Sequence, residues 1–113
     1  MTQTFDPLSA PTWAVDPAYQ FETVAASQTD QMLGATGAAG DYLKKIIIIP
    51  TDLNPGAVSI EYGSTNISVF PGGTNSVNEL RPFWVPLGIR APSGGWEVTT
   101  GADVSVIAVG TFT

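Results

Sequence analysis

The residues of this chain that could carry out chemistry are almost all carboxylates. The 113-residue sequence holds ten Asp and Glu side chains, but it has no histidine and no cysteine. Without histidine it lacks the usual general base and the commonest zinc ligand, and without cysteine it lacks a thiolate ligand and any disulfide. No serine can therefore be activated by histidine, and no motif supports a lysine in that role. We expect a protein that is not an enzyme and that needs no cofactor.

The carboxylates show neither the spacing of an acid–base pair nor that of a metal-binding loop. Six of them fall beside predicted turns or on the polar faces of predicted strands, where solvated carboxylates usually lie: Asp41, Asp52, Glu61, Glu79, Glu97 and Asp103. Asp52 and Asn54 could join a calcium site, but no spaced series of oxygen ligands surrounds them. The glycines from Gly34 to Gly40 are spaced like a phosphate loop, yet no Lys-Ser or Lys-Thr pair follows them. We predict no metal and no phosphate site.

The composition of the chain makes some classes of binding partner improbable and favours others. The net charge is −6 with only four basic residues, and charged residues make up 12% of a chain that is 43% hydrophobic. Neutralising phosphates needs clustered Lys and Arg, so we expect neither nucleic acid nor an anionic membrane as a partner. No apolar run reaches the roughly 18 residues of a membrane span, and Met1–Asp6 does not look like a signal peptide. So little charge indicates a surface partly covered by other proteins.

The element that organises the predicted fold is the isoleucine run Ile46–Ile49, which follows Lys44 and Lys45 and ends at Pro50. Consecutive β-branched residues favour an extended chain, and the run is too short for a buried helix. A strand with isoleucine on both faces needs cover on both faces. We predict a central strand whose isoleucines lie mainly in the core, with the second face covered by another segment or another subunit.

Turn residues about every ten positions divide the remaining sequence into short strands. These are expected in residues 19–26, 27–33, 57–62, 67–70, 81–87, 96–99 and 104–113, with a helix over 22–33 as an alternative. We predict a four-residue hairpin loop at 63–66 and a second hairpin closed by a tight reversal at 100–103. Pro82 and Pro86 place their strand at an edge or a bulge. The pattern predicts an all-β domain over residues 19–113, a two-sheet antiparallel β-sandwich of jelly-roll or immunoglobulin type.

Residues 1–18 differ from the rest because three prolines in eleven residues forbid a helix. Large apolar side chains lie among them: Phe5, Leu8, Trp13 and Val15. We predict an extended, proline-rich arm that docks on a neighbouring subunit, and a disordered tail is the alternative.

Two tryptophans and two arginines complete the candidate interface residues. Trp84 lies on the opposite face of its strand from Phe83 and Val85, and Trp96 follows a Gly-Gly turn. Either ring could stack on a sugar, but we favour a place in the core or at a subunit interface. Arg81 and Arg90 flank the strand that carries Trp84, where they could pair with carboxylates across an interface.

Several stretches resemble small structural proteins of tailed bacteriophages and prophages. They are Leu33–Leu43, Pro55–Ile60, Phe70–Gly73, Pro82-Phe83, Pro86–Arg90 and Gly95–Gly110. Within that group, sandwich proteins of about this length resemble capsid decoration (cement) proteins, which form dimers or trimers on the outer capsid surface. The resemblance covers roughly residues 23–113 and leaves the arm outside it.

The resemblance implies a function and a location. The chain would be a virion structural protein on the capsid outer surface, made in the host bacterial cytoplasm. Its partners would be the major capsid protein and itself, as a homodimer or homotrimer, and it would clamp neighbouring capsid subunits. The alternatives are another virion component (a tail, neck or fibre protein) and a host-surface carbohydrate-binding module.

Overall fold

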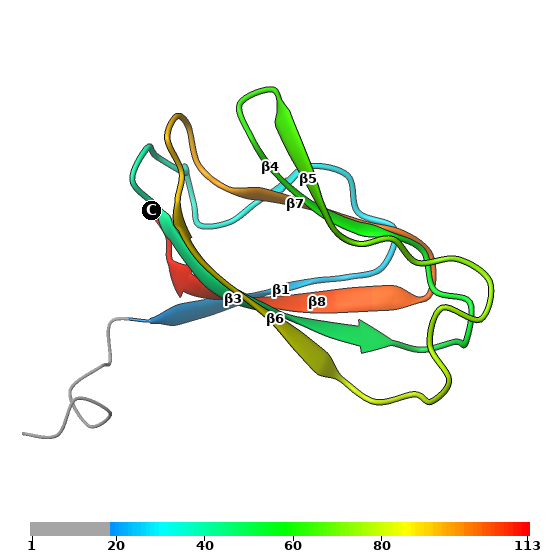
Figure 1. Ribbon diagram of the computed structural model, residues 1–113. Helices are drawn as coiled ribbons and strands as arrows, with labels where there is room; N and C mark the ends of the chain where they lie inside the picture. The colour runs from blue at the N-terminus through cyan, green and yellow to red at the C-terminus, as the bar shows by residue number, and fades with distance from the viewer. Residues whose placement is uncertain (1–18) are drawn as a thin grey trace, which may run out of the picture.

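The computed structural model describes residues 19–113, which form two four-stranded antiparallel sheets facing each other (Figure 1). The predicted arm, with Phe5, Leu8, Trp13 and Val15, lies outside the described residues. The strands are β1 (Gln20–Val24), β2 (Gln31–Met32), β3 (Tyr42–Pro50), β4 (Val58–Tyr62), β5 (Thr65–Phe70), β6 (Phe83–Arg90), β7 (Glu97–Thr100) and β8 (Val104–Thr111). Residues 19–113 contain no helix, and so none that could cross a membrane. The helical alternative for residues 22–33 is therefore wrong.

The strand order is that of a jelly roll. The first sheet has the order β1-β8-β3-β6 and the second has the order β2-β7-β4-β5. The chain thus folds back on itself as a long double ribbon, in which β1 pairs with β8, β2 with β7, β3 with β6 and β4 with β5, always antiparallel. Eight strands in two such sheets define the jelly-roll architecture. The predicted two-sheet antiparallel sandwich is confirmed.

The isoleucine run forms the second half of β3, which lies between β8 and β6 in the first sheet. Successive side chains of a strand point to opposite faces. Ile46 and Ile48 are accordingly buried between the sheets, whereas Ile47 and Ile49 lie half-buried on the outer side. The prediction of a central strand is confirmed. The edge position predicted from Pro82 and Pro86 is also confirmed, because β6 ends the first sheet.

The core lies between the inner faces of the two sheets, and Trp96 is its largest fully buried side chain. The indole Nε1 donates a hydrogen bond to the Asp41 carbonyl oxygen at 3.1 Å. The ring of Tyr62 packs edge-on against the indole, with the centroids 5.3 Å apart. Trp96 therefore fills the core, as we favoured, and offers no surface to a sugar.

Two of the predicted connections are wrong. The β4–β5 hairpin closes over two residues rather than four, because Tyr62 pairs with Thr65 and Gly63 takes a φ of +56°. Residues 100–103 do not close a hairpin, because β7 pairs with β4 and β2 whereas β8 pairs with β1 and β3. This segment crosses between the sheets, and the Gly101 amide donates to the carbonyl of Ala57 beside β4. Turn residues suit both a hairpin and such a crossover, so the local pattern could not separate them.

Candidate functional site

The outer face of the first sheet carries large apolar side chains on all four of its strands. Register places Thr23, Ile107, Ile47 and Trp84 in one row from β1 to β6. We call the following residues the apolar face: Phe21, Ile47, Ile49, Trp84, Ile107 and Val109. The outer side of an isolated antiparallel sheet is normally polar, because water covers it. This face therefore differs from an ordinary solvated sheet surface.

The two aromatic members of the apolar face are the most exposed large hydrophobic residues in the described part of the chain. The exposed fraction is 72% for Phe21 and 62% for Trp84. They lie on the two edge strands, with the half-buried aliphatic residues of β3 and β8 between them. Figure 1 shows no other described segment over this side of the sheet. Exposed apolar surface of this kind marks interaction sites.

Three of the four basic side chains of the protein border the apolar face. The Lys45 Nζ lies 4.6 Å from the centroid of the Trp84 ring, a cation–π contact. At the end where β1 begins, Tyr19 stacks on Tyr42 with the centroids 6.1 Å apart. Further cation–π contacts there place Lys44 Nζ 4.8 Å from the Tyr19 centroid and Arg90 Cζ 5.3 Å from that of Tyr42. The first sheet thus combines an apolar surface with a basic border.

The structure separates the predicted interface residues. Trp84 and Arg90 both lie on β6, and Arg90 Nη1 also donates to the Gly40 carbonyl oxygen. Arg81 precedes β6 and forms an exposed ion pair with Glu79 at 2.7 Å. Such exposed pairs add little stability. Trp84 and Arg90 therefore share one sheet, whereas Arg81 belongs to the segment that leads into it.

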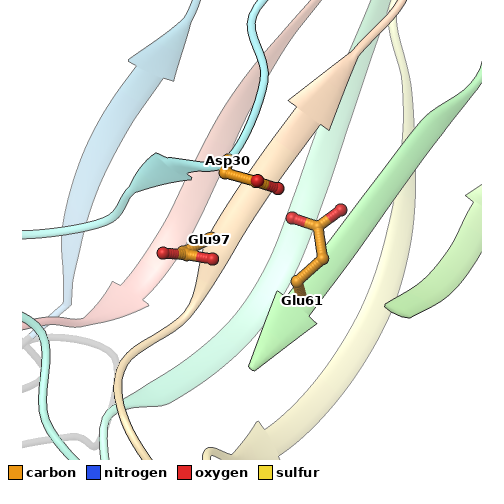
Figure 2. Close-up of side chains that lie close together, drawn as sticks. All are labelled: Asp30, Glu61 and Glu97. Atoms are coloured by element: carbon orange, nitrogen blue, oxygen red, sulfur yellow. The ribbon is translucent and has the colours of Figure 1, made fainter. Parts of the chain in front are cut away.

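A different arrangement lies on the outer face of the second sheet, where three carboxylates converge. Glu61 on β4 and Glu97 on β7 are register partners, and Asp30 directly precedes β2. One oxygen from each residue lies within 4.8 Å of the other two. Figure 2 shows the three side chains directed toward one another. We call these residues the carboxylate triad. Like charges directly opposite each other on a sheet are destabilising.

Glu61 is the buried member of the carboxylate triad. Its exposed fraction is only 6%, and its Oε2 accepts hydrogen bonds from Ser59 Oγ at 2.8 Å and Asn66 Nδ2 at 2.7 Å. Its Oε1 is buried without any hydrogen-bond donor among the described residues. Burial raises the pKa of the Glu61 carboxyl, and the nearby charges of Asp30 and Glu97 add to this, while the hydrogen bond from Ser59 and the nearby Thr99 hydroxyl oppose it.

The expectation that the six carboxylates are solvated is wrong for Glu61 and for Asp41. The Asp41 carboxylate accepts hydrogen bonds from the backbone and hydroxyl of Thr113 and from the Ala38 amide, so it ties the C-terminal residue to the loop before β3. Asp52 and Asn54 do not form a ligand set. Their side chains accept backbone hydrogen bonds within the loops, Asp52 from Asn54 and Asn54 from Asn75.

Sequence reasoning missed the carboxylate triad because register creates it. The alternation of β4 and the β7 region does place Glu61 and Glu97 on polar faces, which was the available signal. Nothing in the sequence aligned those two positions with each other or brought Asp30 beside them.

Comparison with known proteins adds no relative from which a role could be carried over. No protein-family model, no curated protein and no solved structure matches the chain.

Proposed function

We propose that this protein is a non-enzymatic structural component of a phage virion, a capsid decoration protein that self-associates and clamps neighbouring subunits of the major capsid protein. The observation that carries the proposal is the apolar face, a surface of the sandwich that no other part of residues 19–113 covers. The assignment to a phage virion rests on the sequence resemblance. The jelly-roll order is compatible with it, because viral capsid domains use this architecture, although lectins and cupins use it too.

The occupant that we assign to the apolar face is a second copy of the chain. The four strands have 5, 8, 9 and 8 residues. At a spacing of about 4.8 Å between strands and about 3.3 Å per residue, they give a face on the order of 500 Å². Two such faces together bury about 1,000 Å², near the lower limit for a specific interface. A flat apolar sheet can pair with its own copy about a two-fold axis. Self-association through this face alone would therefore be weak.

Weak self-association suits a protein that works on a shell of many identical subunits. Each copy would make modest contacts with its own partner and with the capsid, and those contacts reinforce one another through effective concentration. The basic border formed by Lys44, Lys45 and Arg90 stands out on a chain of net charge −6 and gives the complex a preferred orientation.

Self-association is tested by sedimentation of Trp84→Ala against a matched control. Leu80→Ala removes an apolar side chain of similar exposure, 57%, from the segment before β6 rather than from the apolar face. We expect Trp84→Ala to weaken dimerisation at least tenfold and Leu80→Ala to leave it unchanged. Equal dimerisation by the two variants, or a wild-type chain that stays monomeric at millimolar concentration, would refute the proposal that a second copy covers the apolar face.

The virion role is tested by electron cryo-microscopy of intact particles that carry the protein. We expect a copy number close to that of the major capsid protein, with the sandwich on the outer surface. A few copies at one vertex would point instead to a tail or neck component. A glycan array with wild type and Trp84→Ala addresses the sugar-binding alternative, because binding that depends on Trp84 would favour a carbohydrate-binding module over a decoration protein.

A further inference from the structure

The carboxylate triad concentrates negative charge without a positive side chain to balance it. The chain has four basic residues, and all four lie in residues 19–113. Lys44, Lys45 and Arg90 contact aromatic rings of the first sheet, and Arg81 pairs with Glu79. What surrounds the triad are hydroxyl and amide groups, which supply hydrogen bonds but no positive charge.

The buried oxygen of Glu61 is a second, separate indication that something is bound there. The Glu61 side chain is more than nine-tenths buried, and its Oε2 already accepts two hydrogen bonds. Its Oε1 has no donor, and the side chain points toward Asp30 and Glu97 (Figure 2). Buried acceptors in folded proteins are nearly always satisfied, and an exception calls for an explanation such as an ion. A cation between the three carboxylates would supply the missing partner.

We propose that Asp30, Glu61 and Glu97 bind one Ca²⁺ ion on the outer face of the second sheet. Carboxylate oxygens are the ligands that hard divalent cations prefer. Oxygens bound to one Ca²⁺ at about 2.3–2.6 Å can lie up to about 5 Å apart, whereas Mg²⁺, at about 2.0–2.1 Å, holds its ligands within about 4.2 Å. The three oxygens of the triad, which all lie within 4.8 Å of one another, can therefore reach one Ca²⁺ ion together.

The remaining coordination positions fall to water and to a neighbouring hydroxyl. The hydroxyl of Thr99 already contacts Asp30, donating to its Oδ1 at 3.2 Å and accepting from its backbone amide at 3.0 Å. These contacts hold Asp30 beside β7, the strand that carries Glu97. The ion would also join the residue that precedes β2 to strands β7 and β4, so its binding should stabilise the folded chain.

The site is tested with the full chain after removal of metal by EDTA, at constant ionic strength. Calorimetric titration with CaCl₂ should give one ion per chain, and the melting temperature should rise and saturate. MgCl₂ should bind at least tenfold more weakly. Glu61→Gln and Glu97→Gln should each lower the Ca²⁺ affinity at least tenfold, whereas Glu79→Gln, which removes the same charge from an exposed ion pair, should leave it unchanged.

Three results would overturn the site. These are the absence of saturable binding by the wild type, equal stabilisation by Mg²⁺ or by added NaCl, and undiminished Ca²⁺ affinity in both Glu61→Gln and Glu97→Gln. The second variant keeps the test decisive if one substitution prevents folding. The outcome is independent of the virion role, because it is read on the isolated chain.

Discussion

Alanine substitution along the isoleucine run should give an alternating pattern of stability loss. Ile48 is fully buried between the sheets, whereas its neighbour Ile47 is half-buried on the apolar face. Truncating a buried isoleucine to alanine costs about 2–5 kcal/mol, because it removes three carbons and leaves a cavity. At Ile47 the lost carbons lie at a surface that water can fill, so we expect about 1 kcal/mol at about 0.8 kcal/mol per fully buried methylene.

The comparison isolates packing because both variants make the same chemical change in the same strand. The lower β-propensity of alanine affects both variants equally. The difference between their stability losses therefore shows which side chain lies on the buried face of the strand. We expect Ile48→Ala to lower the free energy of unfolding by about 2–3 kcal/mol more than Ile47→Ala, out of a total of about 5–15 kcal/mol for a domain of this size.

Urea unfolding followed by tryptophan fluorescence, which changes when buried Trp96 becomes exposed, measures both values. The measurement belongs at low protein concentration and should be repeated at a tenfold higher one, because dimerisation through the apolar face would add stability to the wild type. Ile46→Ala and Ile49→Ala provide a second pair with the same expected order. Equal losses within either pair, or a larger loss at the outer position, would refute the assignment of the two faces.

Three further changes test other parts of the structure. Thr100→Val removes the buried hydroxyl that donates to the Ala25 carbonyl oxygen at 2.6 Å, and it should cost about 1–3 kcal/mol in thermal unfolding. Gly72 has a φ of +67°, and a Cβ added there would lie only 2.5 Å from the backbone of Gly56. Gly73 also has a positive φ, but a Cβ added there would meet no atom within 4 Å. Gly72→Ala should therefore lose more stability than Gly73→Ala, and equal losses would contradict this. The pKa of Glu61 is raised by burial, so in the absence of metal the folded state binds the proton of this carboxyl more tightly than the unfolded state does. In EDTA, wild-type stability should therefore fall as the pH rises from about 4.3 through the raised pKa of Glu61. The variant Glu61→Gln should lack this fall.

The strands and the sandwich could be predicted because local patterns determine them. The isoleucine run, the alternation of Val58 and Ile60 and the prolines of β6 each express how one strand meets the core and its neighbours. The exposed position of Trp84 follows from the same alternation, since Phe83 and Val85 face inward. What was predicted correctly thus depends on the two-residue period of a strand.

The errors concern pairing between segments that are distant in the sequence. The turn at 100–103 has the same composition whether it closes a hairpin or crosses between sheets, and only the partners of β7 and β8 decide. The carboxylate triad has the same origin, because a shift of the β4–β7 register would separate Glu61 from Glu97. Burial of Glu61 on an outer face also depends on Asn66 across the hairpin. Residue patterns report the face on which a side chain lies, but not the residue beside it.

The nested pairing of the strands sets the order in which the chain can fold. The β4–β5 hairpin is the only hydrogen-bonded pair of consecutive strands in the described part of the chain, whereas β1 pairs with β8 about 85 residues later. During synthesis β1 therefore has no partner until β8 leaves the ribosome, and its edge with Phe21 stays open until then. Folding that starts at β4–β5 and proceeds outward closes progressively longer loops, which is slow for non-local β-structure. The β1 segment is accordingly where newly made chains would be most prone to aggregate.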